Sequence, residues 1–264
     1  MHAGSFYPAD ANELAGLVDS MMENRARPLP GLMGIIVPHA GFAYSGPTAS
    51  LGYAALPPET ERVILLGPSH HYYLSDIRVW DEEDWETPLG DVSIDRDMVK
   101  ALVEPGHPFS ADARPFLPEH SVEVQAPFLK RILPAARVVP CLVGTLSSHD
   151  LEEAATRIRE ILGEHDIVIA TSDLYHGESY EECVEQDRRT LSLLGRLNGK
   201  GFAMSIANHE AMACGGYAVA LLLEIASGMP NARSDVLGYT NSAEVTGSYM
   251  GYVVGYAAVA ITSG

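Results

Sequence analysis

Histidine side chains follow three apolar segments of this sequence, at the point where each segment ends. His39 follows the apolar run 34–37, His70 and His71 follow 63–66, and Asp173 and His176 follow 167–170. Imidazole nitrogens together with a carboxylate are ligands that divalent transition metals prefer in proteins. A single histidine in such a loop is more often a hydrogen-bonding residue than a metal ligand. The prediction of a metal site therefore rests on the fact that the pattern occurs three times.

Two further features extend this candidate site. Cys214 lies in the segment MACGGYAV, where the glycines can place it at a helix N-terminus that favours the thiolate; the alternative is a buried, inert thiol. Of His70 and His71, only one is expected to point into a shared site, because neighbouring side chains in an extended chain diverge.

The segment EHSVEVQAPF offers a supporting network. His120 and Glu123 lie one helical turn apart, so they are expected to share a face. They can hold a ligand imidazole by its other nitrogen, or belong to a helix cap with Ser121 as the N-cap residue. Near the N-terminus, Phe6 can line a pocket wall or pack into the core.

Alternating apolar and amphipathic segments predict the elements that position these residues. Helices are expected at 11–25, 47–56, 95–103, 121–133, 151–162, 180–197 and 216–226, and strands at 34–37, 63–66, 77–80, 92–94, 138–143, 167–170 and 252–261. This order predicts a layered α/β domain with a mostly parallel central sheet flanked by helices. Ligands bind outside the carboxyl ends of the strands in such sheets, which is where the histidines lie.

Composition limits the possible partners. The 264 residues carry a formal net charge of −18, which argues against nucleic acid or an anionic membrane as a partner. We expect one domain covering residues 1–264, because no linker or repeat divides the chain. Three cysteines form no CxxC pair, and neither a signal peptide nor a membrane span is recognisable, so we expect a cytoplasmic protein.

Six segments, in this order, resemble the Memo family, also known as AmmeMemoRadiSam system protein B: HAGSFYP, PHAGFAYSG, LGPSHH, EHSVEVQAPFL, SDLYHG and ACGG. The matches run from residue 2 to about residue 216. The resemblance implies a LigB-like fold, similar to that of class III extradiol ring-cleaving dioxygenases, which use non-haem Fe(II).

The same resemblance implies roles for individual residues. His39, His70 and Cys214 match the ligand positions, Asp173 and His176 line the same pocket, and the remaining two matches, Tyr44 and Phe6, form its aromatic wall. A cysteine replaces the carboxylate ligand of the true dioxygenases. Because a thiolate is a softer donor, Fe(II) is the expected cofactor, with copper or zinc as alternatives.

Three functions are compatible with these residues. The first is a dioxygenase-like or other redox activity on an unknown substrate, with iron or copper at the His–His–Cys site and His176, steered by Asp173, as the acid–base group. The second is an inactive binding module for a peptide or protein partner, for example a radical SAM protein. The third is zinc-dependent hydrolysis.

Overall fold

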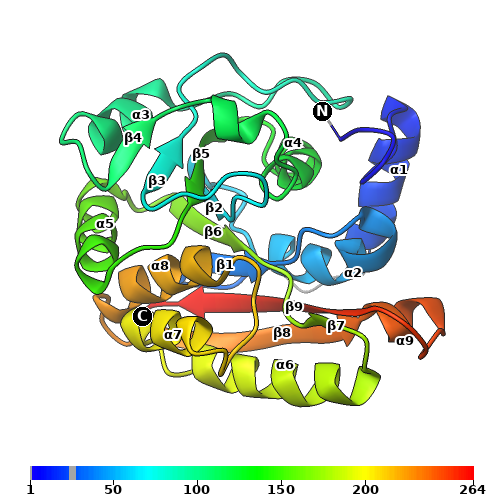
Figure 1. The fold of residues 1–264 in the computed structure, drawn as a ribbon. Helices are drawn as coiled ribbons and strands as arrows, with labels where there is room; N and C mark the ends of the chain where they lie inside the picture. The colour runs from blue at the N-terminus through cyan, green and yellow to red at the C-terminus, as the bar shows by residue number, and fades with distance from the viewer. Residues whose placement is uncertain (1, 24–27) are drawn as a thin grey trace.

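The computed structural model describes residues 2–23 and 28–264, and in this part of the chain one nine-stranded sheet forms the centre of the molecule (Figure 1). The strands are β1 (Leu32–Val37), β2 (Arg62–Gly67), β3 (Ile77–Val79), β4 (Phe109–Ala111), β5 (Arg137–Val143), β6 (Asp166–Thr171), β7 (His176–Gly177), β8 (Arg233–Asn241) and β9 (Val253–Thr262). Their order is β4-β3-β5-β2-β6-β1-β9-β7, with β8 paired to β9. The molecule is therefore a layered α/β fold.

The four central strands, β5, β2, β6 and β1, are parallel to one another. β9 is antiparallel to β1, and β3 is antiparallel to β5. The carboxyl ends of β2, β6 and β1 therefore lie next to one another at the same edge of the sheet. This arrangement confirms the mostly parallel centre that the apolar runs predict.

Helices cover both faces of the sheet (Figure 1). They are α1 (Ala11–Met22), α2 (Phe42–Tyr53), α3 (Arg96–Val103), α4 (Ala126–Ile132), α5 (Ser148–Ile161), α6 (Tyr180–Leu194), α7 (Gly199–Ala207), α8 (Gly216–Ser227) and α9 (Ser242–Thr246), with 3₁₀ turns η1 (Arg114–Phe116) and η2 (Glu123–Gln125). Residues from α1, α2 and α4 form the core on one face, and residues from α3, α5, α7 and α8 form the core on the other.

Side-chain alternation along the central strands explains the two cores. In β2, Ile64 and Leu66 pack on the α8 face, whereas Val63 and Leu65 pack on the α2 face, and all four are fully buried. Burying one such side chain stabilises the fold by roughly 1.5–3 kcal/mol. A strand that is apolar at every position is therefore what this fold requires.

Several expected elements are wrong in extent or type. The segment 92–94 forms only isolated bridges, and 121–133 is a turn, then η2, then the short helix α4. Helix α2 begins at Phe42, so Pro47 lies inside it instead of opening it. The expected helix 11–25 ends at Met22, and its residues 24 and 25 lie outside the described part. The sequence pattern does not predict β4, α7, β8 or α9.

None of the helices in residues 2–23 and 28–264 is long and apolar enough to cross a membrane.

Candidate metal centre

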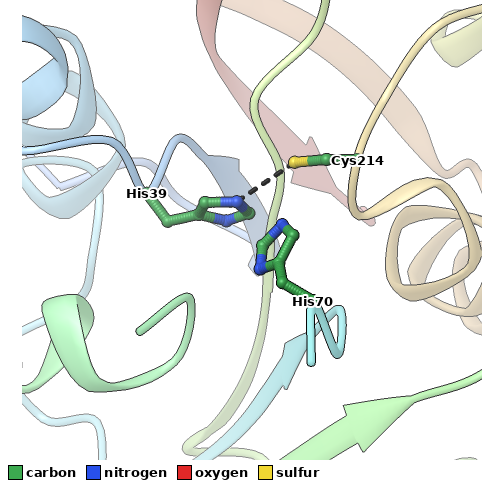
Figure 2. A group of neighbouring side chains, drawn as sticks. All are labelled: His39, His70 and Cys214. Atoms are coloured by element: carbon green, nitrogen blue, oxygen red, sulfur yellow. Dashed lines mark hydrogen bonds between the residues drawn. The ribbon is translucent and has the colours of Figure 1, made fainter. Parts of the chain in front are cut away.

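Three side chains from distant parts of the sequence converge beyond the carboxyl ends of the parallel strands. His39 follows β1, His70 follows β2, and Cys214 precedes α8; Figure 2 shows the three side chains pointing toward one another. Their ligating atoms all lie within 4.8 Å of one another. Cys214 Sγ is 3.0 Å from His39 Nε2, and the two imidazole centroids are 5.3 Å apart. Strand order predicts that the loops with the two histidines meet, and the structure adds Cys214 to them.

A chain of hydrogen bonds fixes the His39 ring in the core. Its Nδ1 lies 2.9 Å from Thr171 Oγ1, and Gln125 Nε2 donates to the same oxygen at 3.0 Å. Gln125 Nε2 also donates to Pro38 O, while Tyr53 OH donates to Gln125 Oε1. A carbonyl oxygen only accepts, so the Gln125 amide has one possible orientation. The contacts leave Nε2 of His39 directed at Cys214.

The carboxylate of Glu119 fixes His70. Its Oε1 lies 2.9 Å from His70 Nδ1, and its Oε2 accepts the backbone N–H of His70. Burial alone would raise the pKa of Glu119, but hydrogen bonds from His70 and Ser121 outweigh it and lower the pKa to about 2. An ionised carboxylate only accepts, so Nδ1 of His70 carries the proton. Its Nε2 is then free to bind a metal.

Close backbone packing positions Cys214. The neighbouring Gly215 donates its N–H to Ser172 Oγ at 2.9 Å, and a Cβ added at Gly215 would lie 2.2 Å from Thr171 O. Glycine is required for this approach. Asp173 N lies 3.2 Å from Cys214 Sγ. The segment therefore presses the thiol against the end of β6.

Electrostatics favour neutral side chains here when no cation is bound. Burial, followed by repulsion from His70 and His120, lowers the pKa of His39 well below its ordinary value. Burial and the Asp173 carboxylate raise the pKa of the Cys214 thiol. Cys214 lies directly before α8 as expected, since Gly215 is the N-cap residue of that helix. Desolvation of the thiolate nevertheless outweighs any stabilisation by the helix. A bound cation would reverse that balance.

Asp173 and His176 lie beside the three ligands but are held separately. Asp173 Oδ1 accepts the backbone N–H groups of His39, at 2.9 Å, and Ala40, at 3.3 Å. His176 Nδ1 lies 3.0 Å from Leu174 O, so the carbonyl, and not Asp173 as expected, orients this imidazole. Because a carbonyl only accepts, Nδ1 of His176 carries the proton and Nε2 is available to accept one. Burial raises the pKa of Asp173 to about 6.

The expected His120–Glu123 network is wrong. Glu123 binds His2 Nδ1, at 2.9 Å, and Tyr7 OH, at 2.8 Å, and holds no ligand imidazole. His120 instead stacks on His70, with ring centroids 4.8 Å apart and an angle of 16° between the planes. Ser121 is not a cap either, because its Oγ donates to Pro68 O.

The remaining expected residues lie around the site. Phe6 stacks on His120 with a centroid distance of 4.4 Å, so it forms a wall of the histidine cluster. Tyr44 is half-exposed on the first turn of α2. His71 is exposed and is not part of the converging group, as expected for one of two adjacent histidines. A cavity of about 140 Å³ opens beside Cys214, lined in part by Tyr72 and Tyr217.

Sequence reasoning missed the residues that orient the two histidines, which are Glu119, Thr171 and Gln125. For two of them, the position in the sequence indicates that the side chain has a polar partner. Thr171 is the polar last residue of an otherwise apolar strand, and Glu119 directly precedes the histidine of the EHS segment. Buried polar residues at strand ends are paired, so each implied a partner.

The residues present fit a transition metal. Two imidazole nitrogens and a thiolate are donors that suit Zn, Cu and Fe, so His39, His70 and Cys214 would hold such an ion. Both imidazoles have a hydrogen-bonding partner at Nδ1, which is the arrangement that fixes a metal-binding histidine.

Comparison with known proteins shows the family of this chain. A family model described as Memo-like protein matches residues 1–260. A MEMO1 family protein of Aeropyrum pernix is 36% identical over 98% of both chains, and one of Pyrobaculum arsenaticum is 33% identical over 97% of this chain and 96% of that protein.

A structural relative supports the fold alone. The crystal structure of an uncharacterised protein from Escherichia coli K12 matches with a TM-score of 0.50 and 12% identity, covering 85% of this chain and 99% of that one. With the family model covering nearly the whole sequence, the chain belongs to the Memo family.

Proposed function

We propose that this protein is a metal-dependent oxidoreductase that holds one Fe(II) ion through His39, His70 and Cys214. The convergence of the three ligating atoms within 4.8 Å carries this proposal. When bound, the ion supplies a Lewis acid and a one-electron redox couple. Copper is the second choice of metal, because imidazole and thiolate donors also suit Cu(I).

The protein side chains around the ion supply proton transfer and positioning. His176, with its Nδ1 proton donated to Leu174 O, presents Nε2 as a base for a substrate hydroxyl or amine. Asp173 holds the backbone at His39 and so keeps that ligand in register. The small cavity beside Cys214 favours a compact substrate group, since pockets for larger molecules are roughly 300–1,000 Å³.

A reducing compartment is part of the proposal. Cys141, Cys183 and Cys214 are all free thiols. Oxidation of Cys214 beyond the sulfenic acid would destroy the ligand irreversibly. We therefore propose the cytoplasm as its location.

Metal analysis of protein purified without oxygen or chelator tests the function. We expect about one iron, or one copper, per chain in the wild type and little in His39→Ala and Cys214→Ser. His149→Ala is the matched control, because that side chain is 84% exposed on α5. Absence of stoichiometric iron and copper would contradict the proposal.

The alternative functions give different results in the same preparation. Stoichiometric zinc with ester or amide hydrolysis would indicate a hydrolase. A metal-free protein that captures a protein partner, such as a radical SAM protein, with an affinity unchanged by chelator would indicate a binding module.

A further inference from the structure

Both tryptophans of the sequence line one cavity, away from the three metal ligands. Trp80, directly after β3, and Trp85 share with Phe116 of η1 the wall of a hollow of about 290 Å³. The ring centroids are 6.0, 5.6 and 6.4 Å apart, and the angles between their planes are 70°, 74° and 61°. The three rings therefore pack against one another in edge contacts and together form an aromatic wall of the cavity.

The aromatic wall can attract a cation. A cation that enters the cavity within roughly 6 Å of the face of one of these rings is attracted by that ring. Tryptophan is the aromatic side chain that binds cations most strongly.

The rings are held in place by the backbone. Trp80 Nε1 donates to Glu83 O at 2.8 Å, and Trp80 N donates to Pro140 O. Trp85 exchanges both backbone hydrogen bonds with Val92. These rings are therefore already ordered in the free protein, so little conformational entropy is lost when a ligand binds.

The charge of the cavity selects a cation. Its lining includes the acidic residues Glu83, Asp84 and Glu86, and also Glu119 and Glu123, whose carboxylates bind His70 and His2. No lysine, arginine or histidine belongs to the lining among the described residues. An anion or a zwitterion with an exposed carboxylate would be repelled here.

We propose that this cavity binds a small molecule bearing a methylated ammonium group, with the cationic head against Trp80, Trp85 and Phe116. A methylated ammonium is weakly hydrated and needs no hydrogen-bond acceptor, so aromatic walls suit it better than they suit a primary amine. The volume is near the lower end of the range for small-molecule pockets, which favours a compact free ligand such as choline. None of the three proposed metal ligands lines this cavity, although Glu119, which orients His70, does.

Intrinsic fluorescence tests the proposal directly, because the chain has only two tryptophans and both line the cavity. Choline and tetramethylammonium are titrated into the full chain, with 3,3-dimethylbutanol as the uncharged isostere of choline and betaine as the zwitterion. We expect the two cations to give a saturable change in emission, with half-saturation below about 10 mM. The uncharged isostere and the zwitterion are expected to bind at least roughly fivefold more weakly than choline.

Variants followed by titration calorimetry separate the aromatic and acidic contributions. Trp85→Leu is expected to weaken choline binding by roughly fivefold or more, whereas Trp85→Phe retains most of it. Glu83→Gln with Glu86→Gln, both at exposed positions, weakens binding with little risk to folding. Tyr73→Leu and the pair Glu160→Gln with Glu164→Gln are the matched controls, at exposed positions outside the cavity.

Three outcomes would overturn the proposal. Choline that fails to saturate leaves no cation site, and equal binding of choline and its uncharged isostere indicates a merely apolar pocket. Binding of a trimethyl-lysine peptide without binding of choline would indicate a protein ligand instead of a small molecule.

Discussion

Cys214 Sγ lies 3.0 Å from Nε2 of His39, although 175 positions separate the two residues in the sequence. The contact exists because β1 and β6 are adjacent and parallel, and because Gly215 packs against the last residue of β6. A cation bound between the thiol and the imidazole is therefore expected to change the protonation of both groups. We therefore expect the proposed metal ion to bind at this contact.

Replacing the sulfur ligand by a carboxylate changes metal selectivity. Cys214→Asp keeps an anionic donor, but a harder one, so we expect Cu(I) and Zn affinity to fall relative to Fe(II) and Mn(II). Competition titrations with each metal measure this ratio. Cys214→Ala, which has no donor, is the control and should bind all four metals poorly. An unchanged metal preference in Cys214→Asp would contradict thiolate ligation.

Removing the carboxylate that orients His70 weakens the metal site without removing a ligand. Glu119→Gln is expected to reduce metal affinity by roughly 10–100-fold, because the partner of the ligand's Nδ1 fixes its orientation and basicity. Glu160→Gln, on the exposed face of α5, is the matched control. Equal affinity in the two variants would show that Glu119 has no positioning role.

The same carboxylate gives the metal-free protein an acid-dependent stability. The pKa of Glu119 is about 2 in the fold and 4.5 ordinarily, so its contribution is complete above about pH 4.5 and is lost as the pH falls toward 2. The difference corresponds to about 3 kcal/mol at most. Urea unfolding with chelator present, from pH 7 to pH 3, should show a smaller loss of stability in Glu119→Gln than in the wild type. Parallel curves would contradict this pKa.

The hydroxyl that binds His39 is expected to matter for both stability and metal binding. Thr171→Val is nearly isosteric but leaves His39 Nδ1 without this partner and removes one acceptor from Gln125 Nε2. We expect a loss of about 1–3 kcal/mol in unfolding free energy and weaker metal binding. Thr156→Val, exposed on α5, is the control. Normal metal affinity in Thr171→Val would show that the hydroxyl does not orient the ligand.

The loop that carries Asp173 and His176 depends on a glycine in β9. Gly255 accepts from Leu174 N and donates to Tyr175 O, and a Cβ there would lie 1.8 Å from Asp187 Oδ2. Gly255→Ala is therefore expected to cost about 1–3 kcal/mol of stability in urea unfolding. Gly16→Ala, at an exposed position in α1 with open space around it, should instead stabilise by about 0.5–1 kcal/mol. Two variants of equal stability would contradict the close packing.

The sequence predicts the centre of the fold better than its edges. Apolar runs such as 63–66 and 167–170 are fully buried on both faces, so hydrophobicity alone identifies them. The segment 233–241 was missed because β8 pairs only with β9 and is mostly exposed or half-buried, so its pattern is weak. The segment 121–133 was misread because Pro127 and the contacts of Ser121 and Gln125 break a helical apolar pattern.

For the site, strand order predicts which loops meet, but not which polar groups pair. His39 and His70 follow adjacent parallel ends, and this follows from the α/β pattern. The partner of His70 is Glu119 and not Glu123, because residues 119 and 120 are irregular and residues 121 and 122 form a turn, so helical spacing does not apply. Cys214 could be joined to the histidines only through the family resemblance, since no strand end precedes it.

The position of β9 has a consequence for biosynthesis. This strand pairs with β1 and also holds residues 174 and 175, so the loop bearing the acid–base candidate cannot settle until residues 253–262 have left the ribosome. A nascent chain carrying His39, His70 and Cys214 would expose these donors without their final scaffold. Metal insertion is thus expected to follow translation of this strand, because the binding geometry is complete only then.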